Sequence, residues 1–254
     1  MITNKKNILF ILPLFSLLFS CNPPEAPKTE EKKEPIKESS TNGTTKGQEV
    51  KDFIPGNWRI IKQVSGDLNK DNLDDVAIVI QATDKKNIIA NDGGLGADSL
   101  DTNLRSLIVL FKDSIGNGYN LILKNDSFIL SQEDPIMADP FSDIAIQKGS
   151  LKLDFEEWSS AGSWFTSHST YLFRYQEGDF TLIGAENKSF MRNSGEGTDY
   201  SFNFLTKKYS TTSTNEFDEK AKPITEWKTI KLDKLPTFKT FTKPYTLKIN
   251  EITL

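Results

Sequence analysis

Oxygen-bearing groups recur at every second position of a short polar segment, residues 66–75, which separates two apolar stretches. Positions 1, 3, 5 and 9, counted from Asp67, are Asp67, Asn69, Asp71 and Asp75. Position 7 is Leu73, which offers only its backbone carbonyl. A hard cation such as calcium takes about six to eight oxygen ligands, and a tight loop that turns alternate residues inward supplies most of them. The spacing therefore predicts a calcium site formed by these five residues and completed by water.

The charge and the turn chemistry of this segment favour a bound cation. The aspartates at three of the ligand positions, Asp67, Asp71 and Asp75, repel one another unless water or a cation screens them. Asn72 stands where such loops usually turn through glycine, and asparagine tolerates the left-handed conformation. An EF-hand is excluded, because position 12 is Ile78 rather than a bidentate glutamate and because a strand is expected to follow. The alternative is a polar hairpin loop in which aspartate and asparagine simply favour turns.

The same pattern, leading directly into Val76-Ala77-Ile78-Val79, resembles the calcium loop of FG-GAP repeats and of dockerin-like modules. The resemblance covers residues 66–80 and implies a structural calcium ion, at the affinity of ~0.1 to 1 mM common for extracellular modules. A propeller of FG-GAP type needs several blades, whereas this chain has one copy of the loop. The propeller fold is therefore not expected here.

Carboxylates and tryptophans lie close together in a second segment. Asp154 and Glu156 are two residues apart in a predicted strand, which would place them ~6 to 7 Å apart on one face, within the range of paired glycosidase carboxylates. Alternation with buried apolar residues makes that face solvent-exposed, and charged outer strand faces are common. A glycan-acting hydrolase using Asp154, Glu156 or Glu157 is thus the alternative to a non-catalytic domain. Trp158 and Trp164 flank a Ser/Gly-rich segment and are candidates for stacking on a sugar ring, or for rim packing.

Other catalytic arrangements lack partners. His168 is the only histidine, with Ser163, Ser167 and Ser169 nearby, but no Gly-x-Ser-x-Gly nucleophile elbow is present. A histidine-based zinc site lacks ligands for the same reason. Residues 93–100 match one turn of a glycine-rich calcium β-roll, which needs stacked copies, so we expect a long mobile loop over residues 84–104. No catalytic residue is assigned.

The N-terminus has the features of an exported lipoprotein. Lys5 and Lys6 precede an apolar run that ends in Leu18-Phe19-Ser20-Cys21. The run is shorter than the ~20 residues that span a bilayer. Its end resembles the lipobox of bacterial lipoproteins, which implies a signal peptide over residues 1–20 and fatty-acyl groups such as palmitate on Cys21. Cys21 is the only cysteine, so a disulfide is excluded. The alternatives are an ordinary secretory signal with an incidental cysteine, or a buried free thiol.

The composition after the leader separates a tether from a folded domain. Residues 21–50 are rich in Pro, Glu, Lys, Ser and Thr, and they bury too little apolar surface to offset the entropy of ordering. Residues 51–254, ~200 residues, suit one domain. Without the two leader lysines, 29 basic residues face 35 acidic ones, so no nucleic-acid partner is expected. We expect anchorage in the cell envelope, in the outer membrane at its periplasmic face or at the cell surface.

Apolar residues in the domain alternate, with turn residues between the runs, which predicts a mainly β fold with little helix. Only the C-terminal tail suggests a helical stripe. We expect an antiparallel sandwich or an irregular barrel of short strands, with a hairpin over residues 169–185 whose Tyr171, Phe173 and Tyr175 face the core. The predicted strands centre on residues 58–64, 76–80, 107–111, 121–123, 144–146, 151–155, 171–175 and 180–182.

Short motifs scattered over the domain are similar to those of a family of uncharacterised bacterial lipoproteins, for which the resemblance implies no activity. They include Phe53-Ile54-Pro55, Asp139-Pro140-Phe141 and Gly162-Ser163-Trp164. We therefore expect a non-catalytic, lipid-anchored β domain that binds or supports an envelope protein or glycan. A hydrolase and an immunity or inhibitor lipoprotein remain as alternatives.

Overall fold

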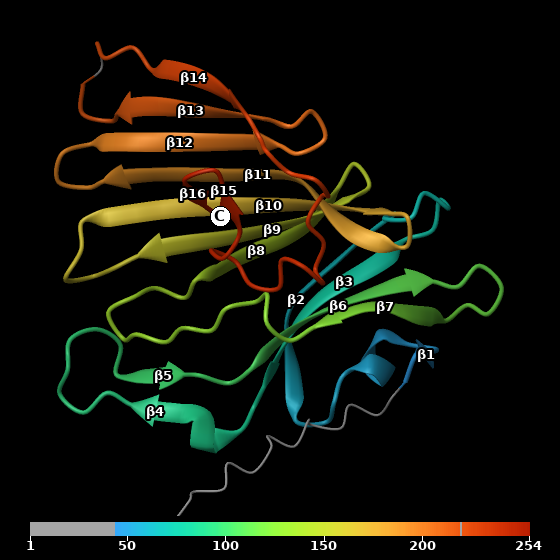
Figure 1. Ribbon diagram of the computed structural model, residues 1–254. Coiled ribbons are helices and arrows are strands. Elements are labelled where there is room, and N and C mark those ends of the chain that lie inside the picture. Colours follow the sequence, from blue (N-terminus) through green and yellow to red (C-terminus); the bar gives the residue numbers. More distant parts are fainter. Residues whose placement is uncertain (1–43, 219) are drawn as a thin grey trace, which may run out of the picture. The chain divides into compact units, whose positions relative to one another are not determined.

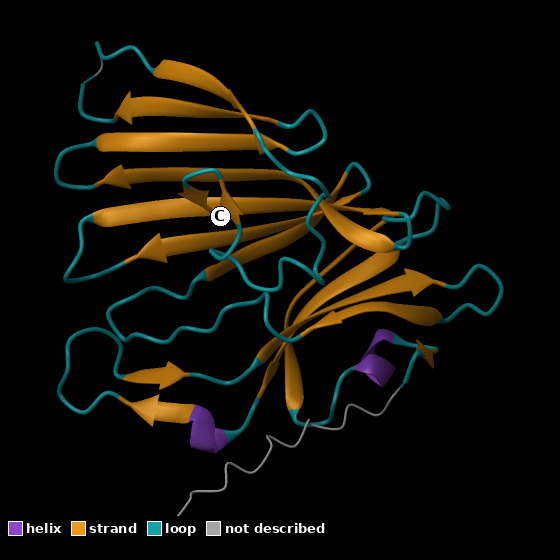
Figure 2. Ribbon diagram, in the orientation of Figure 1, coloured by secondary structure: helices purple, strands orange, loops and turns teal. Residues whose placement is uncertain are grey.

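The computed structural model describes residues 44–218 and 220–254, which are mainly β-structure with two short 3-10 turns (Figure 2). The predicted β fold is confirmed. Two open antiparallel sheets of five and seven strands carry most of the chain, and neither closes on itself, so the sandwich is the architecture present (Figure 1). No helix within these residues is long and apolar enough to cross a membrane.

The five-stranded sheet has the order β1-β7-β6-β3-β2. Its strands are β1 (Lys46–Gly47), β2 (Trp58–Gly66), β3 (Asp75–Ala82), β6 (Arg105–Lys112) and β7 (Tyr119–Asn125). Strands β3 and β6 are continuous apolar runs because both of their faces are buried. One face packs toward the larger sheet, while the other packs against a smaller cluster around Phe53 in the 3-10 turn η1 (Val50–Phe53).

The seven-stranded sheet has the order β14-β13-β12-β11-β10-β9-β8. Its strands are β8 (Phe141–Gln147), β9 (Ser150–Trp158), β10 (Phe165–Gln176), β11 (Asp179–Met191), β12 (Glu196–Asn203), β13 (Lys208–Asn215) and β14 (Ile224–Thr229). The predicted hairpin is β10–β11, in which Tyr171 and Phe173 are fully buried and Tyr175 packs at the margin of the core. Each predicted strand is present, but β12, β13 and β14 were not predicted.

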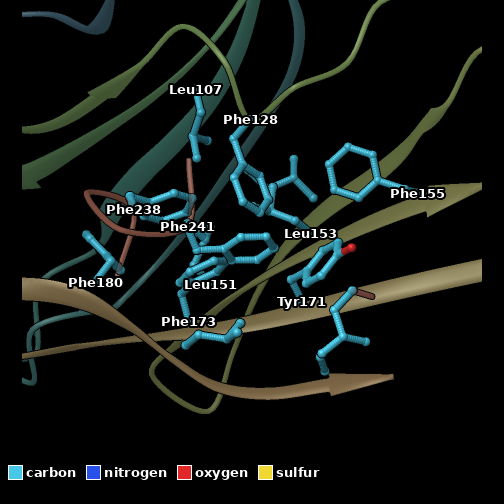
Figure 3. Close-up of a cluster of buried hydrophobic side chains, with 14 of the residues drawn as sticks. Leu107, Phe128, Leu151, Leu153, Phe155, Tyr171, Phe173, Phe180, Phe238 and Phe241 are labelled. Atoms are coloured by element: carbon cyan, nitrogen blue, oxygen red, sulfur yellow. The ribbon is translucent and has the colours of Figure 1, made fainter. Parts of the chain in front are cut away.

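Aromatic side chains fill the space between the sheets (Figure 3). Phe128, from the loop after β7, makes edge-to-face ring contacts with five aromatic residues. The C-terminal segment closes the core. Phe238 and Phe241 stack on Phe173, and the backbone N–H of Tyr245 donates to the Tyr171 hydroxyl.

Three expectations are corrected by these elements. The C-terminal tail forms no helix but a small hairpin, β15 (Lys248–Ile249) and β16 (Ile252–Thr253). The last residues of the expected tether, 21–50, belong to the folded part, because β1 pairs with β7. The expected loop over residues 84–104 contains the turn η2 (Lys85–Asn87) and the hairpin β4 (Ile88–Ala90) and β5 (Ser99–Asp101).

Gly96, between β4 and β5, allows this hairpin to pack closely against the backbone at Pro135. Gly96 has a φ of +97°, and a Cβ at this position would lie 2.0 Å from the carbonyl oxygen of Pro135. The neighbouring N–H of Ala97 donates to that same carbonyl. The glycine-rich sequence is therefore required for close backbone contact, and no β-roll repeat is needed to explain it.

Candidate functional site

The predicted calcium loop closes the hairpin of β2 and β3, where Gly66 pairs with Asp75. Its turns are made by Lys70 and Asn72, whose φ angles are +69° and +65°. The Asp67 carboxylate accepts hydrogen bonds from the backbone N–H groups of Lys70 (2.6 Å) and Asn72 (3.0 Å). The left-handed turn expected at Asn72 is thus present, and Lys70 makes a second one.

Asn69, Asp71 and Leu73 form the outer part of the loop. The Asn69 side chain both donates to the Asp71 carboxylate and accepts from the Asp71 backbone N–H, each at 3.0 Å. Asp71 also accepts from the N–H of Leu73 at 2.8 Å. These bonds hold the loop side chains against the loop's own backbone.

Asp75 and Leu68 tie the loop to the interior. Leu68 is fully buried in the main core, and Asp75 is fully buried at the start of β3. The Asp75 carboxylate accepts from the N–H groups of Leu68 (2.9 Å) and Lys112 (3.0 Å), so it joins the loop to β6. Burial raises the pKa of Asp75. The two backbone N–H groups lower this pKa, whereas the negative charge of nearby Asp71 raises it further. The interior therefore holds a carboxylate whose charge is only partly offset.

The donor set of the loop suits a hard cation, but its side chains do not converge in the geometry described. Within residues 44–218 and 220–254, no three His, Cys, Asp or Glu side chains lie close enough together to hold a metal ion. The Asp67 and Asp71 carboxylates are directed at backbone N–H groups instead. Calcium binding would require these exposed or half-exposed side chains to rotate, while Asp75 is already fixed.

The carboxylates on β9 are separated by the strand's alternation. Asp154 and Glu156 project from one face of β9, and Glu157 from the other. Asp154 was expected to face solvent, but it is buried: it forms an ion pair with Lys152 (2.8 Å) and accepts a hydrogen bond from Thr170 (2.6 Å). The expectation was wrong because Lys152 on the same strand and Thr170 and His168 on β10 contact the Asp154 carboxylate on this face.

Glu157 lies in a polar group on the inner face of the same sheet. Its carboxylate accepts from the Ser167 hydroxyl at 2.8 Å, and Asn187 donates to the Ser169 hydroxyl at 2.8 Å. His168 is exposed on the opposite face, 3.5 Å from Asp154, because β10 alternates. Strand geometry thus directs His168 away from the two buried serines, which makes a Ser–His pair impossible here.

Trp158 and Trp164 are brought together by a residue that the sequence did not single out. The Arg192 guanidinium lies 4.9 Å from the Trp158 ring centroid and 5.8 Å from that of Trp164. It also donates to the carbonyl oxygens of Ser159 (2.6 Å) and Ser163 (2.8 Å). We call Trp158, Trp164 and Arg192 the indole patch. Trp158 is 38% exposed and Trp164 58% exposed, so solvent still reaches much of both rings.

The loop that carries the indole patch is fixed from two sides. Ser160 donates to the Ile136 carbonyl through its backbone N–H (2.8 Å) and its hydroxyl (3.1 Å). The backbone N–H of Arg192 donates to the Trp164 carbonyl at 2.8 Å, just beyond the Phe165–Met191 pair of β10 and β11.

No family model, curated protein or solved structure matches the chain. Functional inference therefore depends on these contacts, and the FG-GAP and lipoprotein resemblances stay predictions.

Cys21 lies outside the described residues, as do the leader and most of the expected tether.

Little in the sequence indicates that Arg192 contacts the two tryptophans, since 28 positions separate it from Trp164. The residues around Arg192 in the sequence give no hint of its tertiary contacts. Only the register of β10 and β11 brings it to the tryptophans.

Proposed function

We propose that this protein is a lipid-anchored, non-catalytic domain of the cell envelope that binds a glycan through the indole patch. The observation that carries the proposal is the fixed Trp158–Arg192–Trp164 arrangement, in which two exposed rings flank one guanidinium. Exposed aromatic groups on a soluble surface commonly mark a binding site. Because Arg192 is fastened to backbone carbonyls, the rings would lose little conformational freedom when a ligand binds.

A glycan suits this surface on chemical grounds. The ring of a pyranose has an apolar face of C–H groups that stacks on an indole, and hydroxyl groups around its rim that need hydrogen-bond partners. The Arg192 guanidinium and the serines of residues 159–163 supply polar groups beside the indoles. Because Arg192 lies over one face of each indole, a sugar ring would stack on the exposed remainder of the rings and make its polar contacts at their edge.

The state of the carboxylates supports a non-catalytic role. A glycosidase needs two carboxyl groups free to act on one bond, as acid and as base or nucleophile. Asp154 is buried and paired with Lys152, and Glu157 lies on the other face of β9, bonded to Ser167. Glu156 is then the only exposed carboxylate of the three that faces the outer surface.

The test is titration of the purified protein with a panel of soluble envelope-type oligosaccharides by isothermal calorimetry. Trp164→Ala is expected to weaken binding by about five- to thirty-fold, because it removes one stacking surface worth ~1 to 2 kcal/mol. Phe217→Ala is the control, since Phe217 is also an exposed aromatic residue but lies in the turn between β13 and β14. Equal losses of affinity in both variants, or no binding to any oligosaccharide, would contradict glycan binding at the indole patch. Release of free sugar during incubation would contradict the non-catalytic role.

Membrane attachment through Cys21 has its own test. In Cys21→Ser the acceptor thiol is lost, so the protein is expected to move from the membrane fraction to the soluble fraction. Mass spectrometry of the native protein should show a chain beginning at Cys21 with acyl groups attached. An unmodified thiol, or a retained leader, would show that the anchor is wrong.

We also propose that calcium binds the β2–β3 loop and stabilises the domain. Support comes from the four oxygen side chains at alternate positions and from Asp75, whose buried charge a nearby cation would offset. The ion's role would be structural, because the loop is bonded to the core through Leu68 and Asp75.

A further inference from the structure

Strand β14 leaves one edge of the seven-stranded sheet open. In the part of the chain that the structure describes, β13 is its only neighbour, and all six of its residues are exposed (Figure 1). Ile224 and Trp227 are 68% and 69% exposed. The strand pairs with β13 without a register shift and contains no proline, so it lacks the bulges and prolines that commonly block such edges.

The alternation of backbone hydrogen bonds shows which groups point outward. The N–H of Ile230 donates to the carbonyl of Lys207 at 2.9 Å, continuing the β13–β14 register. In an antiparallel pair, every second residue makes such bonds. The even-numbered residues therefore bond to β13, while Thr225, Trp227 and Thr229 direct their N–H and C=O groups to the open edge.

We propose that β14 pairs antiparallel with β14 of a second copy of this chain, about a two-fold axis at Trp227. In this register Trp227 lies opposite Trp227 of the second copy. Thr225 lies opposite Thr229 of the second copy, and Glu226 opposite its Lys228. All outward backbone groups of these three odd-numbered residues find partners. Glu226 and Lys228 fall in the closer, non-hydrogen-bonded positions, so opposite charges meet where side chains approach most closely.

The charges select this register over its neighbours. A shift by two residues in one direction sets Glu226 against Glu226, and in the other direction Lys228 against Lys228. Shifts by one residue set outward backbone groups against inward ones. Within one copy, Glu226 and Lys228 already form an ion pair of 3.3 Å on one face, so the strand carries no net charge that would repel a second copy.

The surface beside Trp227 also accommodates a second strand. A hollow of about 500 Å³ is lined by Lys208, Trp227, Lys228 and Thr229. In the proposed pair the two indoles lie side by side on the outer face of the joined sheets, next to this hollow. A two-fold contact of this kind is self-complementary and closes, which limits the assembly to a dimer.

The experiment measures the mass of the full lipidated chain in a non-ionic detergent by native mass spectrometry over a range of concentrations. The wild-type chain should form a dimer. Glu226→Lys and Lys228→Glu should each raise the dissociation constant by about ten-fold or more, because each sets like charges opposite one another at two positions. The double variant should restore pairing, and the two single variants should pair with each other when mixed.

These surface substitutions leave the core untouched, so a loss of pairing would not reflect unfolding. A wild-type chain that stays monomeric would overturn the proposal. A dimer that survives both single reversals would show that another surface is used. Cross-links between β14 and residues 1–43 of the same chain would show that the edge is occupied from within.

Discussion

Replacing Phe128 with alanine lowers the free energy of unfolding by about 3 to 5 kcal/mol. Phe128 is fully buried, and its ring meets Phe155, Tyr171, Phe173, Phe238 and Phe241 at centroid distances of 5.0 to 6.0 Å. It contacts both the seven-stranded sheet and the C-terminal segment (Figure 3), so its removal leaves a cavity that neither can readily fill. Denaturant unfolding followed by tryptophan fluorescence measures the loss.

Phe217→Ala is the matched control for this prediction, because the same side chain is removed from a position that is 64% exposed. We expect a change within about 0.5 kcal/mol there. If the two variants lose equal stability, the aromatic cluster is not the principal core. If Phe128→Ala changes the denaturant slope as well as the midpoint, the substitution has altered the compactness of the native or the unfolded state, or unfolding is no longer two-state.

Calcium at 10 mM raises the free energy of unfolding by about 1.4 to 2.7 kcal/mol, if the loop binds with an affinity of ~0.1 to 1 mM. For a domain of this size, that corresponds to a melting temperature higher by roughly 3 to 10 °C. Asp67→Asn and Asp71→Asn should each remove the calcium effect. At position 71 asparagine keeps an oxygen for the N–H of Leu73, so this change is largely one of charge. At position 67 asparagine keeps an oxygen for only one of the two backbone N–H groups, so Asp67→Asn also removes a hydrogen bond within the loop.

Asp92→Asn is the control, because Asp92 is exposed and lies in the β4–β5 turn, away from the β2–β3 loop. Thermal unfolding is followed in calcium and in excess chelator. A melting temperature that is the same in both solutions would exclude the metal. An undiminished calcium effect in Asp67→Asn and Asp71→Asn would place the ion elsewhere.

The strands that sequence alternation predicted are those that border the core. β9 and β10 bury one face more than the other, so their apolar residues recur with the strand period, whereas β3 and β6 bury both faces and are continuous apolar runs. β12, β13 and β14 were missed because serine, threonine and charged residues dominate them and much of their surface stays exposed. They are strands because β11 supplies an edge to pair with, which is information that no local pattern contains.

The candidate sites also divide into features that the local sequence predicts and features that depend on tertiary contacts. The loop of residues 67–75 could be identified from spacing because its groups are adjacent in the chain. The burial of Asp154 and the role of Arg192 depend on neighbours in other strands, Thr170 and Trp164 among them. The proposed edge contact of β14 likewise needs the hydrogen-bond direction given by Ile230.

The C-terminal segment has a consequence for biosynthesis. Phe238, Phe241, Ile249 and Leu254 are buried in the main core, and the backbone of Leu254 exchanges hydrogen bonds with Leu247. A chain emerges from the ribosome N-terminus first, so the two sheets lack these core side chains until the final residues appear. Since many of the strand pairings are also long-range, we expect stable folding only after residues 238–254 have been synthesised. Such a delay would keep the polypeptide unfolded for longer, which the proposed export through a translocon would require.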